Sequence, residues 1–87
     1  PAYFFYFMEC LIEAAKSQGL SDEIARKLTF QTALGAAKMV LQTPDSVQEL
    51  RQKVTSKGGT TEQGINTLKD GKMAELLQRM LAAATQH

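Results

Sequence analysis

The sequence predicts an all-α fold of about five helices in a single domain covering residues 1–87. Two observations support this prediction. Apolar residues recur at helical spacing along the chain, and no stretch alternates polar and apolar residues with the turn chemistry of a β-hairpin. Glycine, proline and hydroxyl residues also stand where such helices would start and stop. An apolar fraction of 44% is normal for a globular domain of this small size.

The first two helices are delimited by residues with clear local preferences. The first covers residues 1–18 and stops at Gly19, a natural left-handed residue after a helix. The second, residues 22–42, is capped by Ser21 and closed by Pro44. At 1.5 Å per residue this second helix would be about 30 Å long, the width of a small domain.

Two capping-box patterns predict the next two helices. Ser46 with Glu49 predicts a short third helix that ends near residue 53. Thr60 with Gln63 has the same spacing and predicts the start of a fourth helix.

The fifth predicted helix follows Gly71 and covers residues 72–84. Its apolar residues form one continuous stripe, which is typical of a helix with one buried face. The stripe consists of Met73, Leu76, Leu77, Met80, Leu81 and Ala84.

The long helix 22–42 carries two apolar faces separated by a narrow polar strip. These faces are formed by Ala25, Leu28, Thr32, Gly35, Ala36 and Met39, and by Phe30, Leu34, Ala37 and Leu41. A helix that is apolar on several sides normally lies inside a larger core. We therefore expect this long central helix to be covered by a second copy of the chain. The alternative is a compact monomeric five-helix bundle, and the molecular mass in solution distinguishes the two.

Composition excludes several classes of function. A net charge of +1 with mixed signs argues against a nucleic-acid surface. The single cysteine, Cys10, and the single histidine, His87 at the terminus, provide no metal site, and one cysteine favours a reducing, cytoplasmic compartment. The apolar residues 3–8 are interrupted by Glu9 and Glu13 too early for a membrane span.

The segment 54–61 is the strongest candidate for a ligand site. It places two glycines and four hydroxyl residues directly before a predicted helix. A helix start has free N–H groups and a partial positive charge, so it can hold a small anion such as a carboxylate. The alternative is that the hydroxyl residues only cap the helix. A nucleotide is not expected, because the glycine-rich phosphate-binding fingerprints are absent.

The other candidate residues favour packing over chemistry. We expect the apolar residues Phe4, Phe5, Phe7 and Met8 to be core and Cys10 to behave as a buried hydrophobe. The absence of an internal histidine leaves no evident nucleophile–base pair, so the chain alone lacks the parts for most catalysis.

Four sequence blocks occur in the order and spacing of a known family. The blocks are Pro1-Ala2-Tyr3, Gln31-Thr32-x-x-Gly35-Ala36-Ala37-Lys38-Met39, Leu50-Arg51-x-x-Val54-Thr55-Ser56 and Gly58-Gly59-Thr60-Thr61. With these blocks the chain resembles the C-terminal domain of pyrroline-5-carboxylate reductase over nearly all its length. The start at Pro1 instead of Met agrees with a piece of a longer protein.

The resemblance implies an interlocked homodimer of the type formed by the C-terminal domain of 6-phosphogluconate dehydrogenase. It also implies an upstream Rossmann domain, absent from this chain, that binds NADPH or NADH. The full-length enzyme would reduce 1-pyrroline-5-carboxylate to L-proline, whereas this chain alone would bind no cofactor and be inactive.

The resemblance further implies the site residues, all of them in the glycine-rich loop. The substrate-binding residues would be Ser56, Gly58, Gly59, Thr60 and Thr61. The N–H groups of Gly59, Thr60 and Thr61 would hold the substrate carboxylate, and the Ser56 side chain would assist. The Thr61 hydroxyl would hydrogen-bond the ring nitrogen and relay a proton to it.

The chain departs from the family pattern at three places. Lys57 replaces the usual proline, Gly64 replaces alanine, and Lys72-Met73-Ala74 replaces a common Gly-Phe-Arg. These departures leave two alternatives open, a non-catalytic helical interaction module and a divergent imine reductase with another substrate. A dinucleotide-binding fingerprint upstream of Pro1 would favour an enzyme. A start codon near Pro1 would favour the interaction module.

Overall fold

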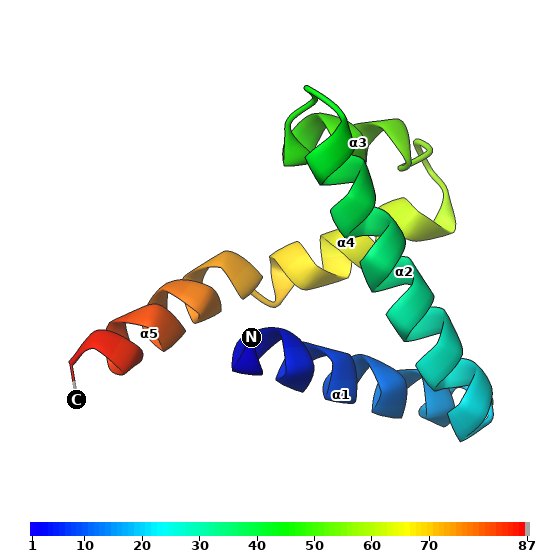
Figure 1. The fold of residues 1–87 in the computed structure, drawn as a ribbon, viewed down its shortest axis with the longest axis horizontal. Coiled ribbons are helices and arrows are strands. Elements are labelled where there is room, and N and C mark those ends of the chain that lie inside the picture. The colour runs from blue at the N-terminus through cyan, green and yellow to red at the C-terminus, as the bar shows by residue number, and fades with distance from the viewer. Residues whose placement is uncertain (87) are drawn as a thin grey trace. The chain divides into compact units, whose positions relative to one another are not determined.

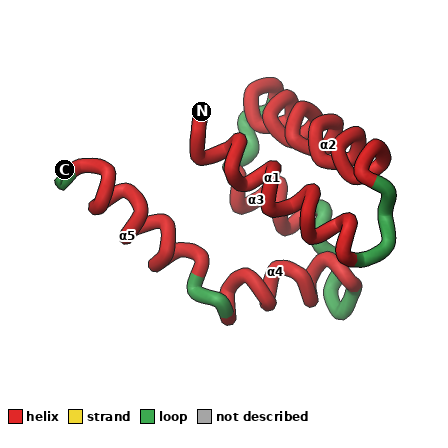
Figure 2. Tube along the Cα trace, turned by 90° about the horizontal axis from the view of Figure 1, so that it is seen from below, coloured by secondary structure: helices red, strands yellow, loops and turns green. Residues whose placement is uncertain are grey.

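The computed structural model describes residues 1–86, which form five α-helices and no strand (Figures 1 and 2). The all-α prediction is confirmed. The helices are α1 (Ala2–Ser17), α2 (Asp22–Gln42), α3 (Val47–Lys53), α4 (Thr60–Asp70) and α5 (Met73–Thr85). They belong to two compact units, one of residues 1–45 with α1 and α2, the other starting at Ser46 with α3, α4 and α5. His87, expected to be a terminal residue and not a ligand, lies outside the described residues.

The turn between α1 and α2 follows the predicted capping chemistry. Gly19 is left-handed, with φ of 103°. Its N–H donates to the Lys16 carbonyl at 3.0 Å, and the Leu20 N–H donates to the Ala15 carbonyl at 3.2 Å. This pair of bonds is a Schellman motif, which satisfies the last carbonyls of α1. The Ser21 hydroxyl then accepts a first-turn N–H of α2 at 3.2 Å, as predicted.

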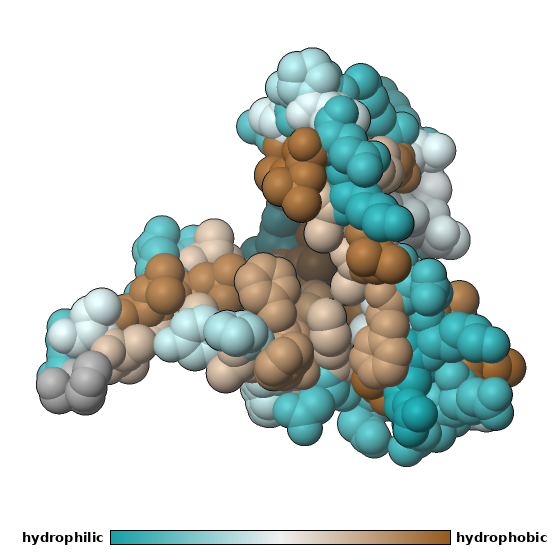
Figure 3. Space-filling model, in the orientation of Figure 1, coloured by the Kyte–Doolittle hydropathy of each residue, from teal (hydrophilic) through white to brown (hydrophobic). Residues whose placement is uncertain are grey.

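The two apolar faces of α2 remain largely open in the single chain. Ala25 and Thr29 are its only buried residues, at 1% and 7% exposure. Leu28, Phe30 and Leu34 expose 46–53% of their surface. Figure 3 shows such apolar residues, coloured brown, on the molecular surface. Within the unit of residues 1–45, α1 therefore leaves most of both apolar faces of α2 uncovered.

The aromatic residues of α1 are also exposed, which corrects the expectation that they form a core. Phe4, Phe5 and Phe7 expose 74%, 62% and 48% of their surface, and Met8 is half-buried. Cys10, expected to be buried, is exposed as well. The reason is that, within residues 1–45, α1 has one neighbouring helix, α2, and the two helices diverge from their connecting turn (Figure 1). One neighbouring helix cannot cover a helix that is apolar on several sides.

The second unit starts with the predicted capping box of α3. The Ser46 hydroxyl accepts the Glu49 N–H at 3.0 Å, and the Glu49 carboxylate accepts the Ser46 N–H at 2.9 Å. The hydrogen bonds from Ser46 lower the pKa of Glu49. The pKa of Glu49 is therefore lower in the folded than in the unfolded protein. The stability that these hydrogen bonds contribute is fully present above the unfolded-state pKa of Glu49, and it is lost as the pH falls through the folded-state pKa.

The junction between α4 and α5 differs from the prediction in one detail. Gly71 ends α4 with φ of −78°, and the next residue, Lys72, is left-handed, with φ of 59°. The fifth helix accordingly begins at Met73, one residue later than predicted. After this bend α5 continues away from α4 and does not fold back on it (Figures 1 and 2). Its apolar stripe therefore stays open, with Leu76 and Leu77 exposed.

We expect Lys72→Gly to stabilise the protein by about 1 kcal/mol. A side chain in the left-handed region is unfavourable by about 1–2 kcal/mol, and part of this gain is offset by the greater freedom of glycine in the unfolded chain. Thermal unfolding of the full-length protein should show a higher Tm. The control Lys69→Gly, inside α4, should lower the stability by about 1 kcal/mol. A Tm for Lys72→Gly at or below that of the wild type would contradict the prediction.

None of the helices in the described part of the chain combines the length and the apolar character needed to cross a membrane.

Candidate functional site

The loop between α3 and α4 is built around a tight turn. The Gly59 N–H donates to the Ser56 carbonyl at 3.0 Å, so residues 56–59 form a β-turn. Gly58, at its third position, has φ of 76°, the value that a type II turn requires. A β-carbon on Gly59 would lie 3.2 Å from the Ser56 carbonyl oxygen, which makes this position tight for any side chain. The two glycines are thus explained by the geometry of one turn.

The start of α4 differs from the predicted capping box, which is wrong. The N-cap residue is Gly59, which has no side chain, and no side chain caps the helix. In place of Gln63, the Glu62 carboxylate reaches back, and its Oε1 accepts the Gly58 N–H at 2.9 Å. Gly59 is extended, with φ of −85° and ψ of 178°, so the chain enters the helix without help from the Thr60 hydroxyl.

This arrangement leaves backbone donors open at the start of α4. The N–H groups of Thr60, Thr61 and Glu62 have no hydrogen-bond partner within residues 1–86, and the first internal bond comes from Gln63 to Gly59 at 3.3 Å. Of the three predicted donors, Gly59 already serves the turn, while Thr60 and Thr61 remain open.

Of the four hydroxyl groups in the segment, one forms a hydrogen bond within residues 1–86 and three do not. Thr55 is occupied, because its hydroxyl donates to the Arg51 carbonyl at 2.6 Å. The hydroxyls of Ser56, Thr60 and Thr61 form no hydrogen bond with any other described residue, and all three residues are exposed. The alternative that these hydroxyl residues only cap the helix is therefore wrong.

The open donors and hydroxyls suit a small anion. Two adjacent first-turn N–H groups at a helix start, where the dipole is positive, can hold the two oxygens of a carboxylate. The exposed Lys57 adds a positive charge in the same turn, while the half-buried Glu62 adds a negative one. The resulting balance favours a ligand with a single negative charge.

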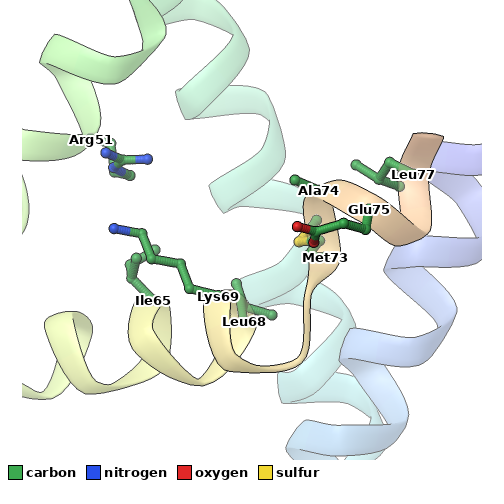
Figure 4. A pocket seen from close by; sticks show the side chains of 8 residues that line it. All are labelled: Arg51, Ile65, Leu68, Lys69, Met73, Ala74, Glu75 and Leu77. Carbon is green, nitrogen blue, oxygen red and sulfur yellow. The ribbon is translucent and has the colours of Figure 1, made fainter.

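A separate groove of about 500 Å³ lies elsewhere in the same unit. It contains no residue of the loop and is lined by Arg51, Ile65, Leu68, Lys69, Met73, Ala74, Glu75 and Leu77. Figure 4 shows Arg51 extending from α3 and Lys69 from α4 on one side, with Leu77 of α5 on the other. Because α5 does not fold back, this groove is an uncovered apolar surface.

No cluster of three or more His, Cys, Asp or Glu side chains suitable for a metal ion occurs in residues 1–86.

Comparison with known families decides which group this chain belongs to. The family model described as pyrroline-5-carboxylate reductase dimerisation matches residues 1–87. The chain belongs to this family.

Several pyrroline-5-carboxylate reductases are similar in sequence or structure. The enzyme of Pseudomonas aeruginosa is 45% identical over 86 residues, which cover 99% of this chain and 32% of that protein. A solved pyrroline-5-carboxylate reductase from Coxiella burnetii has 56% identity and a TM-score of 0.93, covering 97% of this chain and 31% of the other. The Plasmodium falciparum enzyme, solved with NADP bound, has 34% identity and a TM-score of 0.93, covering 97% of this chain and 33% of that chain. The chain thus spans about a third of the length of these relatives.

The turn geometry shows what one departure from the pyrroline-5-carboxylate reductase pattern changes. Lys57 occupies the second position of the type II turn, where proline is favoured because its φ is already set. The usual proline of the family would therefore stiffen this turn.

Glu62 is the residue that the sequence reasoning missed, and its position in the first turn of a helix was the available signal.

Proposed function

We propose that this chain is the C-terminal dimerisation and substrate-binding domain of a pyrroline-5-carboxylate reductase. The full-length protein would reduce 1-pyrroline-5-carboxylate to L-proline with NADPH or NADH. The observation that carries the proposal is the start of α4, where the N–H groups of Thr60 and Thr61 and three nearby hydroxyls are open. The single carboxylate of a small cyclic imino acid suits these donors in charge.

Each residue of the loop has a distinct role in this proposal. The N–H groups of Thr60 and Thr61 hold the substrate carboxylate, and the Ser56 hydroxyl donates to it. Gly58 and Gly59 shape the turn and allow the substrate to approach the backbone closely. The resemblance also gave the Gly59 N–H a direct role, which would require the substrate to share this N–H with the Ser56 carbonyl or to displace that carbonyl.

The Thr61 hydroxyl is the group closest to the chemistry in this proposal. NAD(P)H, held mainly by an N-terminal Rossmann domain, would supply the hydride that adds to the imine carbon. Thr61 orients the ring by a hydrogen bond to its nitrogen. As the carbon–nitrogen double bond is reduced, the exposed Thr61 hydroxyl relays a proton from solvent to that nitrogen. Reduction of the imine thus consumes one hydride and one proton.

The second part of the proposal concerns the assembly. The open faces of α1, α2 and α5 would be covered by a second copy of this chain in an interlocked homodimer. Among residues 1–86, twenty large apolar residues are exposed in the single chain, including Phe4 at 74% and Leu41 at 84%. This exceeds what a monomeric protein normally leaves open, and the dimerisation family to which the chain belongs supports self-association.

The experiment is an activity assay of the full-length protein. We expect oxidation of NADPH or NADH that depends on added pyrroline-5-carboxylate, with L-proline as the product. The isolated chain, at the same concentration, should show none. No substrate-dependent oxidation with either nucleotide would overturn the proposed reaction and favour a non-catalytic interaction module. Reduction of another cyclic imine alone would favour the divergent paralogue.

A further inference from the structure

We propose that Glu62 is a positioning residue that holds the substrate loop in its binding shape. The proposal rests on the function proposed above. Its basis is a single contact made by a residue outside the predicted site: the Glu62 carboxylate accepts a hydrogen bond from the Gly58 N–H.

The contact closes the loop onto the helix that presents the donors. Glu62 Oε1 lies 2.9 Å from the Gly58 nitrogen, and Glu62 is half-buried whereas Thr60 and Thr61 are exposed. Glu62 is the third residue of α4, so its backbone is fixed by the helix. The negative carboxylate is favoured there by the positive end of the helix dipole. The hydrogen bond therefore ties the third residue of the turn to a rigid element.

The turn needs such a restraint because of Lys57. Proline at this position would limit φ to the value that the turn uses, whereas lysine leaves the unfolded loop many more conformations. Only one backbone bond, from Gly59 to Ser56, otherwise closes the turn. The bond from Gly58 to Glu62 supplies a second restraint to the same four residues.

Glu62 has other possible partners, which it does not use. A polar hollow of about 280 Å³ is lined by Glu62 together with Arg51 of α3 and Lys69 of α4. Neither cation forms an ion pair with Glu62 in the described part of the chain. The carboxylate binds the loop although two positive side chains border the same hollow.

The charge and the hydrogen bond of Glu62 then act in opposite directions on substrate binding. The hydrogen bond orders the loop and favours binding, because less freedom is lost when the substrate arrives. The negative charge lies next to the proposed carboxylate site and disfavours an anionic substrate. Substitutions that remove one effect or both should therefore change the KM in different directions.

The test compares three variants of the full-length enzyme. Glu62→Ala removes the hydrogen bond, and we expect the KM for pyrroline-5-carboxylate to rise by about tenfold with little change in kcat. Glu62→Gln keeps a carbonyl acceptor and removes the charge, so the KM should fall by about two- to fivefold. Adding Lys57→Pro to Glu62→Ala should restore most of the lost affinity, because proline stiffens the turn independently.

A second measurement does not depend on the substrate. Hydrogen exchange of the Gly58 amide in the free protein should be faster in Glu62→Ala and close to wild type in Glu62→Gln. Unchanged Gly58 exchange and unchanged KM in Glu62→Ala would overturn the proposal. So would a Glu62→Gln variant that matches Glu62→Ala, or a Lys57→Pro variant that restores nothing. If the wild type lacks pyrroline-5-carboxylate reductase activity, the proposed function fails, while Gly58 exchange still decides whether Glu62 orders the loop.

Discussion

Thr61→Ala in the full-length enzyme should lower kcat by about 100-fold or more, because it removes the only hydroxyl proposed to reach the imine nitrogen. The structure leaves this hydroxyl without a partner in residues 1–86, so the substitution breaks no internal hydrogen bond. The Thr61 N–H is retained in the variant and would continue to hold the carboxylate. The KM should therefore change much less than kcat, and steady-state kinetics with pyrroline-5-carboxylate separate the two.

Two further variants make this result specific. Thr61→Ser retains a hydroxyl and should restore most of the turnover. Thr67→Ala removes a hydroxyl from the same helix, where it donates to the Gln63 carbonyl at 2.9 Å, and should leave kcat within about twofold of the wild type. Unchanged turnover in Thr61→Ala would remove Thr61 from the mechanism. Equal losses in Thr61→Ala and Thr67→Ala would point to a general disturbance of α4.

Local signals in the sequence predicted most of the helix boundaries, because each depends on a few neighbouring residues. Gly19, Ser21 and the pair Ser46 and Glu49 form the caps that their residue types indicate. The prediction was wrong at the start of α4, where the sequence is compatible with two different helix caps. Thr60 with Gln63 has the usual spacing, but the chain uses Gly59 as the cap and Glu62 as the reaching carboxylate. The local sequence pattern alone does not show which of these two ways of starting the helix is more stable.

The position of the core could not be predicted from one chain, for a different physical reason. The apolar pattern of α1 indicates that residues such as Phe4 must be covered. It does not indicate whether another part of the same chain or a second copy covers them. In the described chain Phe4 is 74% exposed, since within residues 1–45 only α2 is available to pack on α1. The candidate site, which stays a prediction, was more accessible to sequence reasoning. Glycines and hydroxyl residues before a helix indicate a helix start with free N–H groups, whereas the turn became clear only from the bond between Gly59 and Ser56.

Leu77→Asp should convert the full-length protein from a dimer to a monomer at micromolar concentration. Leu77 lies near the middle of the apolar stripe of α5 and is 41% exposed in the single chain. If a second copy covers it, each dimer loses two buried leucines, or about 3–6 kcal/mol, and two charges would be buried as well. The dissociation constant should rise by about 100-fold or more, which sedimentation or light scattering can measure.

The adjacent polar residue provides the control. Gln78→Asp introduces the same side chain into α5 one position later, away from the stripe, and should leave the dimer intact. If α5 faced water in the assembled protein, the two variants would behave alike, since an exposed leucine contributes little to stability. A dimeric Leu77→Asp protein would therefore exclude α5 from the interface. A monomeric wild type would overturn the proposed dimer itself, and with it the explanation for the open faces of α1 and α2.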